Sequence, residues 1–195
     1  MERGHALSVS DEGAARGRAH LPLIVTVELP AELQARMNAL RAAHYPPERN
    51  WLKAHVTLFH ALPPSIEPEL RRALAMLTAE LAPPRARIAG IMSLDGGTAV
   101  RIESEKVLAM HDRLADRFHG VLSAQDDHPP RLHVTVQNKV AREAARALQG
   151  RLEREVKRVA FRFRALVLHA YRGGPWELRG RWPFRGRLGN GGVGH

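Results

Sequence analysis

The sequence predicts an α+β fold of two pseudo-symmetric lobes, each a mainly antiparallel sheet with helices on its outer face. Strand-like and helix-like segments alternate along the chain, and a similar order of strands and helices occurs twice. Two Gly-rich turns, Asp95-Gly96-Gly97 and Arg172-Gly173-Gly174-Pro175, each separate two strand-like segments. Segments joined by such short turns form antiparallel hairpins, which argues against an all-parallel sheet.

Each element of the first half follows from its apolar pattern and from the prolines that separate it from the next. Ser65 is suited to cap the second helix, because its hydroxyl can accept a hydrogen bond from a backbone amide of the first turn. In chain order we expect a strand over 23–29, a helix over 33–44, a strand over 53–62, a helix over 66–81 and hairpin strands over 87–94 and 98–103.

The second half repeats this order. Ser104 is suited to cap its first helix, and Gly150 weakens the middle of its second. In chain order we expect a helix over 107–121, a strand over 131–137, a helix over 140–156 and two closing strands over 159–171 and 176–184.

Length and composition fit one globular domain. The 195 residues are 44% hydrophobic, which is enough for an ordinary core, and we expect one bilobal domain over 21–184 between a flexible tail at 1–20 and a Gly-rich tail at 185–195. The absence of cysteine excludes disulfide scaffolds, cysteine-based zinc sites and thiolate nucleophiles. No apolar run approaches the ~18 residues of a membrane span, so we expect a cytoplasmic chain without membrane association.

The positive charge is concentrated near the C-terminus. The formal net charge is +10, and residues 1–130 carry 15 basic and 16 acidic side chains, whereas 131–195 carry 15 basic and 4 acidic ones. Such an excess favours an anionic partner, although the predominance of Arg over Lys is equally typical of a compositional bias. If the charge is functional, the second lobe should present it to the groove through Arg131, Lys139, Arg142, Arg162 and Arg164.

One motif occurs twice. His55-Val56-Thr57-Leu58 and His133-Val134-Thr135-Val136 each lie in an expected strand that precedes a helix, and together they use two of the five threonines in the chain. Side chains alternate in a strand, so the His and Thr of each motif should share one face. If the lobes are related by an approximate two-fold axis, two imidazoles and two hydroxyls can meet around one ligand.

This set of groups suits displacement at a phosphodiester. The reaction needs a base for the attacking oxygen and an acid for the leaving oxygen, and a histidine with a pKa of ~6.5 can serve as either near neutrality. Threonine hydroxyls can donate hydrogen bonds to the non-bridging oxygens.

The paired motifs, about 80 residues apart in a repeated strand and helix order, resemble those of the 2H phosphoesterase superfamily, in particular the bacterial 2′-5′ RNA ligase and RNA 2′,3′-cyclic phosphodiesterase group. The resemblance covers about residues 22–184 and includes the opening segment Leu23-Ile24-Val25-Thr26-Val27-Glu28-Leu29-Pro30. It implies a bilobal fold with a central active-site groove and the opening of a 2′,3′-cyclic phosphate to a 2′-phosphate.

The same resemblance implies roles for the motif residues. His55 would protonate the leaving 3′ oxygen, His133 would activate water, and Thr57 and Thr135 would hold the phosphate; the ligase direction reverses the proton transfers. We expect a monomer that binds an RNA end or a nucleotide cyclic phosphate, with no metal, no cofactor and no obligate protein partner.

Alternation of side chains adds three candidates. Lys53 and Arg131 each lie two residues before a motif histidine and can place a cation near the phosphate, although solvated cations are common at strand ends. Phe59 lies two residues after Thr57 and can stack on a base, although a core position is equally compatible with the pattern.

Three alternatives remain at this point. The two His-Thr pairs can be structural hydrogen-bonding groups, or the chain can be a non-catalytic RNA-binding protein that uses its basic C-terminal lobe. A metal site is the third, but His55 and His60 should face opposite ways on a regular strand, and residues 126–128 fit a polar loop.

Overall fold

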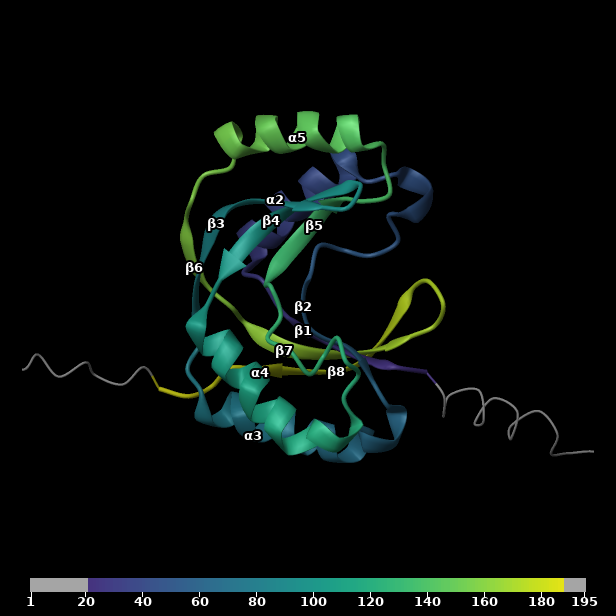
Figure 1. Cartoon of the computed structure of the whole chain (residues 1–195). Coiled ribbons are helices and arrows are strands. Elements are labelled where there is room, and N and C mark those ends of the chain that lie inside the picture. The colour runs from purple at the N-terminus through teal and green to yellow at the C-terminus, as the bar shows by residue number, and fades with distance from the viewer. Residues whose placement is uncertain (1–20, 188–195) are drawn as a thin grey trace, which may run out of the picture.

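Two antiparallel four-stranded sheets form the framework of the part of the chain that the structure describes (Figure 1). The computed structural model describes residues 21–187. In spatial order, the first sheet contains β2 (Val56–Leu62), β1 (Leu23–Val27), β7 (Ala165–Tyr171) and β8 (Trp176–Pro183). The second sheet contains β5 (His133–Gln137), β4 (Gly97–Glu103), β3 (Arg85–Leu94) and β6 (Ala160–Arg162). The predicted α+β class with two antiparallel sheets is therefore confirmed.

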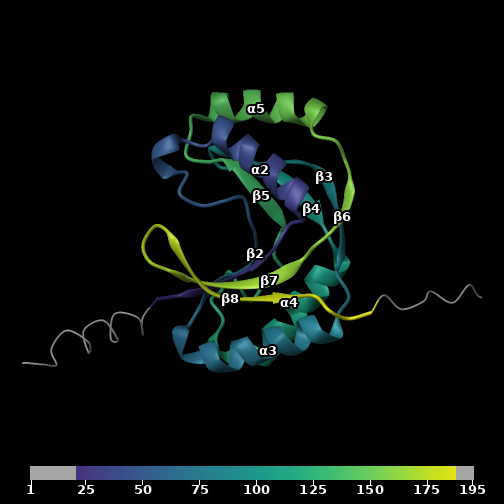
Figure 2. The ribbon, with the colours of Figure 1, turned by 180° about the vertical axis from the view of Figure 1, so that it is seen from behind.

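Between residues 21 and 187, four α-helices cover the outer faces of the sheets. Helices α2 (Ala31–His44) and α5 (Arg142–Glu155) pack on the second sheet, whereas α3 (Glu67–Glu80) and α4 (Glu105–Phe118) lie below the first sheet in Figure 1, as the reverse view in Figure 2 also shows. Single turns of 3₁₀ helix connect some of these elements, at Pro47–Arg49, Pro64–Ile66 and His119–Val121. Within the described residues, no helix is long and apolar enough to cross a membrane.

The lobes do not correspond to the two halves of the chain, which corrects the expected division. Strand β7 pairs with β1, and β8 pairs with β7, so both closing strands belong to the sheet that contains the N-terminal strand. All five residues of β1 are buried, and a central strand of this kind requires a hydrogen-bonding partner on each side. Helix α2 likewise follows β1 in sequence but packs against β5 of the other sheet.

Of the helix caps and turns predicted from local sequence, some are present in the structure and one is not. The Ser104 side chain accepts a hydrogen bond from the Val107 amide at the start of α4, as predicted. Ser65, in contrast, is not a helix cap, because it lies within the 3₁₀ turn that precedes α3. The turn at Asp95-Gly96 joins β3 to β4 as expected, and Gly96 adopts a positive φ of 66°.

The two ends of the domain are only partly described. The expected tail over 1–20 and residues 188–195 of the other tail lie outside the described residues. Beyond the expected end at 184, the amide of Arg185 donates to the carbonyl oxygen of Thr78 and that of Gly186 to Leu81. These contacts place the chain after β8 against the end of α3.

Candidate active site

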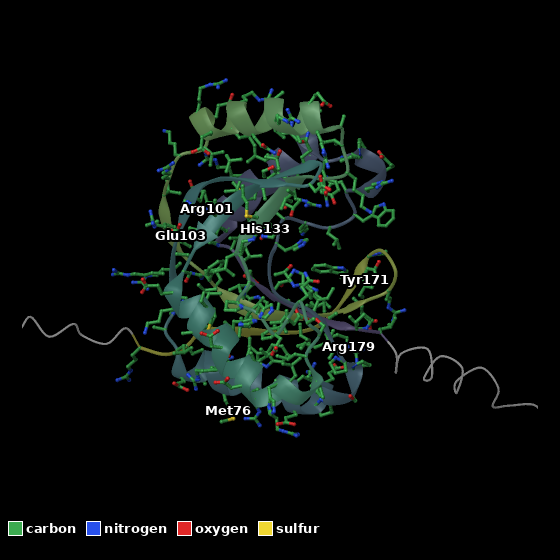
Figure 3. The ribbon with its side chains drawn as sticks, viewed as in Figure 1. Met76, Arg101, Glu103, His133, Tyr171 and Arg179 are labelled. Atoms are coloured by element: carbon green, nitrogen blue, oxygen red, sulfur yellow. The ribbon has the colours of Figure 1, made fainter. Side chains whose placement is uncertain are left out.

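The two His-Val-Thr segments lie on facing edge strands. Strand β2 is at one edge of the first sheet, β5 is at one edge of the second, and the two strands contact each other. His55 immediately precedes β2 and His133 begins β5. Figure 3 places His133 between the two lobes. The structure thus brings the two motifs together, although 78 residues separate them.

Both motif histidines are held by the same contact. Nδ1 of His55 is 2.8 Å from the carbonyl oxygen of Lys53, and Nδ1 of His133 is 2.6 Å from that of Arg131. A carbonyl oxygen can only accept a hydrogen bond, so the proton of each neutral ring resides on Nδ1. Nε2 of each ring has no hydrogen-bond partner within residues 21–187 and is the atom that can accept or donate a proton.

The motif threonines lie half-buried on the same strands. Thr57 is opposite Thr26 in the first sheet, and Thr135 is opposite Ala99 in the second. Neither hydroxyl of the two motifs is hydrogen-bonded to another group of residues 21–187, whereas Val56 and Val134 between them and the histidines are fully buried. The two hydroxyls are therefore available to a ligand.

A bulge lies directly after the threonine of each motif and changes which residues face the site. Thr26 pairs with Thr57 but Val25 pairs with Phe59, so Leu58 is an extra residue in β2. The register of β5 shifts at the equivalent place, where Val136 is extra. Two consecutive residues after each threonine are consequently buried.

The bulge corrects two expectations. Phe59 is completely buried and stacks on His111 with ring centroids 4.6 Å apart, so it has no free face for a base. His60 is brought to the side of the motif residues: burial is the main cause that lowers the pKa of His133, and a positive charge on His60 adds to this shift. The regular alternation used in the sequence argument places His60 on the wrong side for this reason.

Asp126 fixes the end of β2 next to His60. Its buried carboxylate accepts hydrogen bonds from the backbone amides of His60 (2.7 Å) and Ala61 (2.8 Å), and one oxygen is 3.2 Å from Nδ1 of His60. Burial alone would raise the pKa of Asp126, but these hydrogen bonds outweigh it and lower the pKa. The segment interpreted from sequence as a polar loop thus holds one motif strand in place.

Arg41 is a further site residue that the motif argument missed. It is buried on α2, and its Nη1 donates a hydrogen bond of 2.7 Å to the carbonyl oxygen of Thr135. Its Nε is buried without a hydrogen-bond partner, and its guanidinium carbon lies 4.2 Å from the ring centroid of Tyr45. The residue therefore places a positive charge beside β5, and this charge also acts on His55.

Aromatic rings line the first-sheet side of the site. The ring of Trp176 is 4.5 Å from that of His55 and 5.3 Å from that of His169, measured between centroids. Nε2 of His169 is 3.2 Å from the Thr26 hydroxyl. Trp51 is 63% exposed, and its ring lies over Gly174. A Cβ atom added at residue 174 would lie only 3.0 Å from the Trp51 ring. The only signal for Trp176 in the sequence is its place directly after the Gly-Gly-Pro turn.

Burial keeps the motif imidazoles neutral in the free protein. It lowers the pKa of His55 from its ordinary value to about 4; the hydrogen bond to the Lys53 carbonyl opposes this shift, and the charge of Arg41 adds to it. Burial also lowers the pKa of His133, although the hydrogen bond to the Arg131 carbonyl raises it. Burial lowers the pKa of His169 as well. At neutral pH the site offers two unprotonated Nε2 atoms, two hydroxyls and a buried guanidinium.

The predicted cations near the motifs lie before the strands. Both Lys53 and Arg131 are exposed, and the contact that each makes with its motif histidine comes from its carbonyl oxygen. Of the other basic residues expected at the groove, Arg142 pairs with Asp95 at the β3–β4 turn, and Arg162 donates to the Pro83 carbonyl. Neither of these two contacts involves a motif residue.

The chain is similar to known proteins in sequence and in fold. Residues 29–175 match the sequence pattern of the 2′-5′ RNA ligase superfamily. No curated protein sequence matches the chain. Its fold is similar to TT0787 of Thermus thermophilus, with a TM-score of 0.59, 18% identity, and coverage of 86% of this chain and 100% of the other. It is also similar to Escherichia coli LigT complexed with 3′-AMP, with a TM-score of 0.53, 18% identity, and coverage of 85% and 98%.

Replacing Arg41 tests its electrostatic effect on the site. Arg41→Met keeps a long side chain but removes a cation that disfavours protonation of His55, so the pKa of His55 should rise. The measurement is an NMR titration of the imidazole signals, with Arg36→Met as control because Arg36 is exposed on the same helix. An unchanged His55 pKa in Arg41→Met, or an equal rise in the control, would contradict this electrostatic role.

Proposed function

Because the chain belongs to the 2′-5′ RNA ligase superfamily, we propose that it is a cyclic phosphodiesterase that opens a 2′,3′-cyclic phosphate, at an RNA end or in a nucleotide, to a 2′-phosphate. Family membership supports a phosphodiester-processing activity in general. The observation that carries the specific proposal is the matched pair of imidazoles, each with its proton fixed on Nδ1 and its Nε2 available. Such a pair supplies both the acid and the base of the reaction without a metal ion.

The proposed reaction is an in-line displacement at phosphorus. Nε2 of neutral His133 accepts a proton from water as the water oxygen bonds to phosphorus. The bond between phosphorus and the 3′ oxygen breaks, and protonated His55 donates its proton to that oxygen. The products are a 2′-phosphate and a 3′-hydroxyl group. In ligation a 5′-hydroxyl would take the place of water: His133 would accept its proton as the 5′ oxygen bonds to phosphorus, the bond to the 3′ oxygen would break, and His55 would protonate that oxygen, which leaves a 2′-5′ phosphodiester and a 3′-hydroxyl group.

The substrate itself assists protonation of His55. Its pKa of about 4 makes the imidazolium scarce in the free protein at neutral pH. A bound phosphate anion favours the charged ring and raises this pKa, because opposite charges attract strongly in a partly buried site. The Thr57 and Thr135 hydroxyls would donate to the non-bridging oxygens of the same phosphate.

Two further observations support a nucleotide as the ligand. Trp176 offers a half-buried aromatic ring next to His55, and aromatic side chains are suited to stacking on bases. A protein of similar fold, Escherichia coli LigT, has a structure in complex with 3′-AMP. A role in RNA binding without catalysis would use the same contacts, and turnover distinguishes the two.

Substitution of the motif histidines tests the reaction. His55→Asn and His133→Asn should each lower kcat on adenosine 2′,3′-cyclic phosphate by ~10²–10⁴, and the double variant should lose less than the product of the two effects. Product is measured as adenosine 2′-phosphate, with a chelator present. His119→Asn is the control, because His119 is exposed in the 3₁₀ turn after α4. Turnover by the double variant at the wild-type rate would refute the mechanism.

The pH dependence reports the two lowered pKa values. The reaction needs one protonated and one neutral histidine, so kcat/KM should be bell-shaped, with both limbs below the ordinary histidine pKa of ~6.5. The acid limb reflects protonation of the base, and the alkaline limb reflects loss of the proton from the acid. The kcat profile should lie at higher pH, because the bound anion raises both pKa values. A flat kcat/KM between pH 4 and 9 would contradict the two-histidine mechanism.

Trp176 should contribute to binding more than to the chemical step. Trp176→Ala should raise KM for adenosine 2′,3′-cyclic phosphate by roughly tenfold, within the ~1–3 kcal/mol range of base stacking, and Trp176→Phe should restore most of the loss. Leu178→Ala is the control, because Leu178 is an exposed apolar residue on the same strand. Steady-state kinetics with unchanged KM in Trp176→Ala would exclude stacking on this ring.

A further inference from the structure

His60 is a third imidazole on the face of β2 that carries Thr57. The bulge at Leu58 turns it to this face, and its side chain is 37% exposed. Strand β2 contacts β5, and a positive charge on His60 acts on His133 at the start of β5. The His60 ring therefore lies beside the motif residues of both strands and is accessible to a ligand held between them.

Asp126 determines which nitrogen of His60 can reach a ligand. The pKa of Asp126 is lowered, so its carboxylate is ionised at neutral pH and can only accept hydrogen bonds. One of its oxygens is 3.2 Å from Nδ1 of His60, and this nitrogen therefore carries a proton. Nε2 of His60 makes no hydrogen bond within residues 21–187. The ring thus resembles those of His55 and His133 in its fixed Nδ1 and available Nε2, but its partner is an anion.

The anionic partner suits His60 to bind another anion. In the imidazolium form Nδ1–H donates to Asp126, and Nε2–H can donate to a second acceptor. The carboxylate compensates the charge of the ring, and a hydrogen bond from a charged donor is stronger than one between neutral groups. The carbonyl oxygens that hold His55 and His133 carry no full negative charge that could compensate an imidazolium in this way. His60 therefore differs from the motif histidines in the task for which its surroundings suit it.

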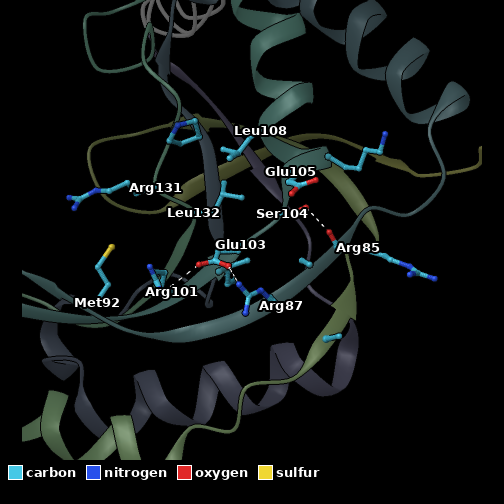
Figure 4. Close-up of a pocket in the computed structure, with 15 residues that line it drawn as sticks. Arg85, Arg87, Met92, Arg101, Glu103, Ser104, Glu105, Leu108, Arg131 and Leu132 are labelled. Atoms are coloured by element: carbon cyan, nitrogen blue, oxygen red, sulfur yellow. Dashed lines mark hydrogen bonds and ion pairs between the residues drawn. The ribbon is translucent and has the colours of Figure 1, made fainter.

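The cations on the second-sheet side of His133 are held differently. Arg101 lies opposite His133 in the sheet, and Arg131 precedes it. Both border a pocket of about 820 Å³ between β3, the end of β4, the start of α4 and the residues before β5 (Figure 4). Arg101 is paired with Glu103, as a dashed line in Figure 4 marks, and Arg131 is an exposed side chain. Neither guanidinium is fixed next to a motif threonine, whereas Asp126 fixes the His60 ring on the strand that carries Thr57.

We propose that His60 is a further substrate-binding residue, whose imidazolium ring donates a hydrogen bond from Nε2 to a non-bridging oxygen of the reacting phosphate. This inference rests on the proposed function, which places that phosphate between His55 and His133. The three imidazoles then divide their tasks: His55 and His133 exchange protons with substrate oxygens, whereas His60 keeps its proton through the reaction and contributes charge. The competing explanation is a purely structural one, in which His60 only fastens Asp126 to β2.

Sulfate is the probe for this contact, because it is a tetrahedral dianion whose charge does not change near neutral pH. Its affinity is measured at pH 6 from the ring signals of His133 in NMR spectra, which report binding at the site itself. We expect His60→Leu to bind sulfate about tenfold more weakly than the wild type, and His60→Gln, which keeps a neutral donor, to lie between them. The control is His119→Leu, because His119 is exposed in the turn after α4. Wild-type affinity in the two His60 variants, or an equal loss in the control, would overturn the inference.

Proton uptake separates a charged contact from a structural one. An anion that binds the imidazolium form of a ring draws a proton from solution, so sulfate affinity should fall as pH rises. Titration calorimetry at pH 7.5, above the ordinary histidine pKa of ~6.5, gives the number of protons taken up per sulfate when two buffers of different ionisation enthalpy are compared. This number should be smaller in His60→Gln than in the wild type, because glutamine does not titrate. An unchanged number would overturn the inference even if the affinity falls.

These measurements do not depend on turnover, so the two proposals can fail separately. A wild-type protein that does not open adenosine 2′,3′-cyclic phosphate would refute the proposed function, and the sulfate measurements would still decide whether His60 binds an oxyanion. Turnover by the wild type, together with wild-type sulfate affinity in His60→Leu, would refute the role of His60 alone.

Discussion

The candidate site depends on how the protein covers two open strand edges. Strands β2 and β5 each have one sheet neighbour, so each has an open edge whose backbone groups are not paired with a further strand of its sheet. Asp126 binds two successive amides of β2, and Arg41 binds the Thr135 carbonyl of β5. Side chains thus satisfy groups that would otherwise invite a direct strand pairing. Because the two edges are capped in this way, they can face each other without merging into one sheet, and the imidazoles lie where they meet.

The repeated motif makes the site symmetric in its contacts but not in its surroundings. The same Nδ1 contact and the same bulge occur in both strands. His55, however, lies against Trp176, and the positive charge of Arg41 disfavours its protonation. A positive charge on His60 disfavours protonation of His133, and the neighbours of His133, Arg101 and Arg131, line a pocket. Acid and base catalysis at one phosphate require one protonated and one neutral imidazole at the same time. The unequal surroundings make the two rings distinguishable, which the two nearly identical tetrapeptides do not.

Sequence reasoning succeeds where the determining interactions are local. The hairpin at Asp95-Gly96 and the cap at Ser104 depend on neighbouring residues, and both are present. The order of elements is also as expected except over 159–171, where the expected single strand is divided into β6 of the second sheet and β7 of the first. Sequence reasoning fails where a distant strand decides the outcome. The bulge that buries Phe59 and turns His60 toward the site depends on how β2 pairs with β1. Trp176 lies next to His55 because β7 pairs with β1 in the same sheet. Local periodicity contains no information about such pairings.

The charge of a sequence segment is a poor guide to the charge of a surface. Arginines of the basic C-terminal third are partly neutralised inside the first lobe, where Arg181 pairs with Glu28 and Arg179 with Glu67. Such pairs add little stability when they are solvent-exposed, but they cancel local charge. Four of the five cations that line the pocket between β3, β4 and α4 instead come from residues 85–106, in the part of the chain whose net charge is close to zero. Folding returns β8 to Glu28, which follows β1, and to Glu67 of α3, so a count of charges along the sequence does not predict which surfaces carry unpaired cations.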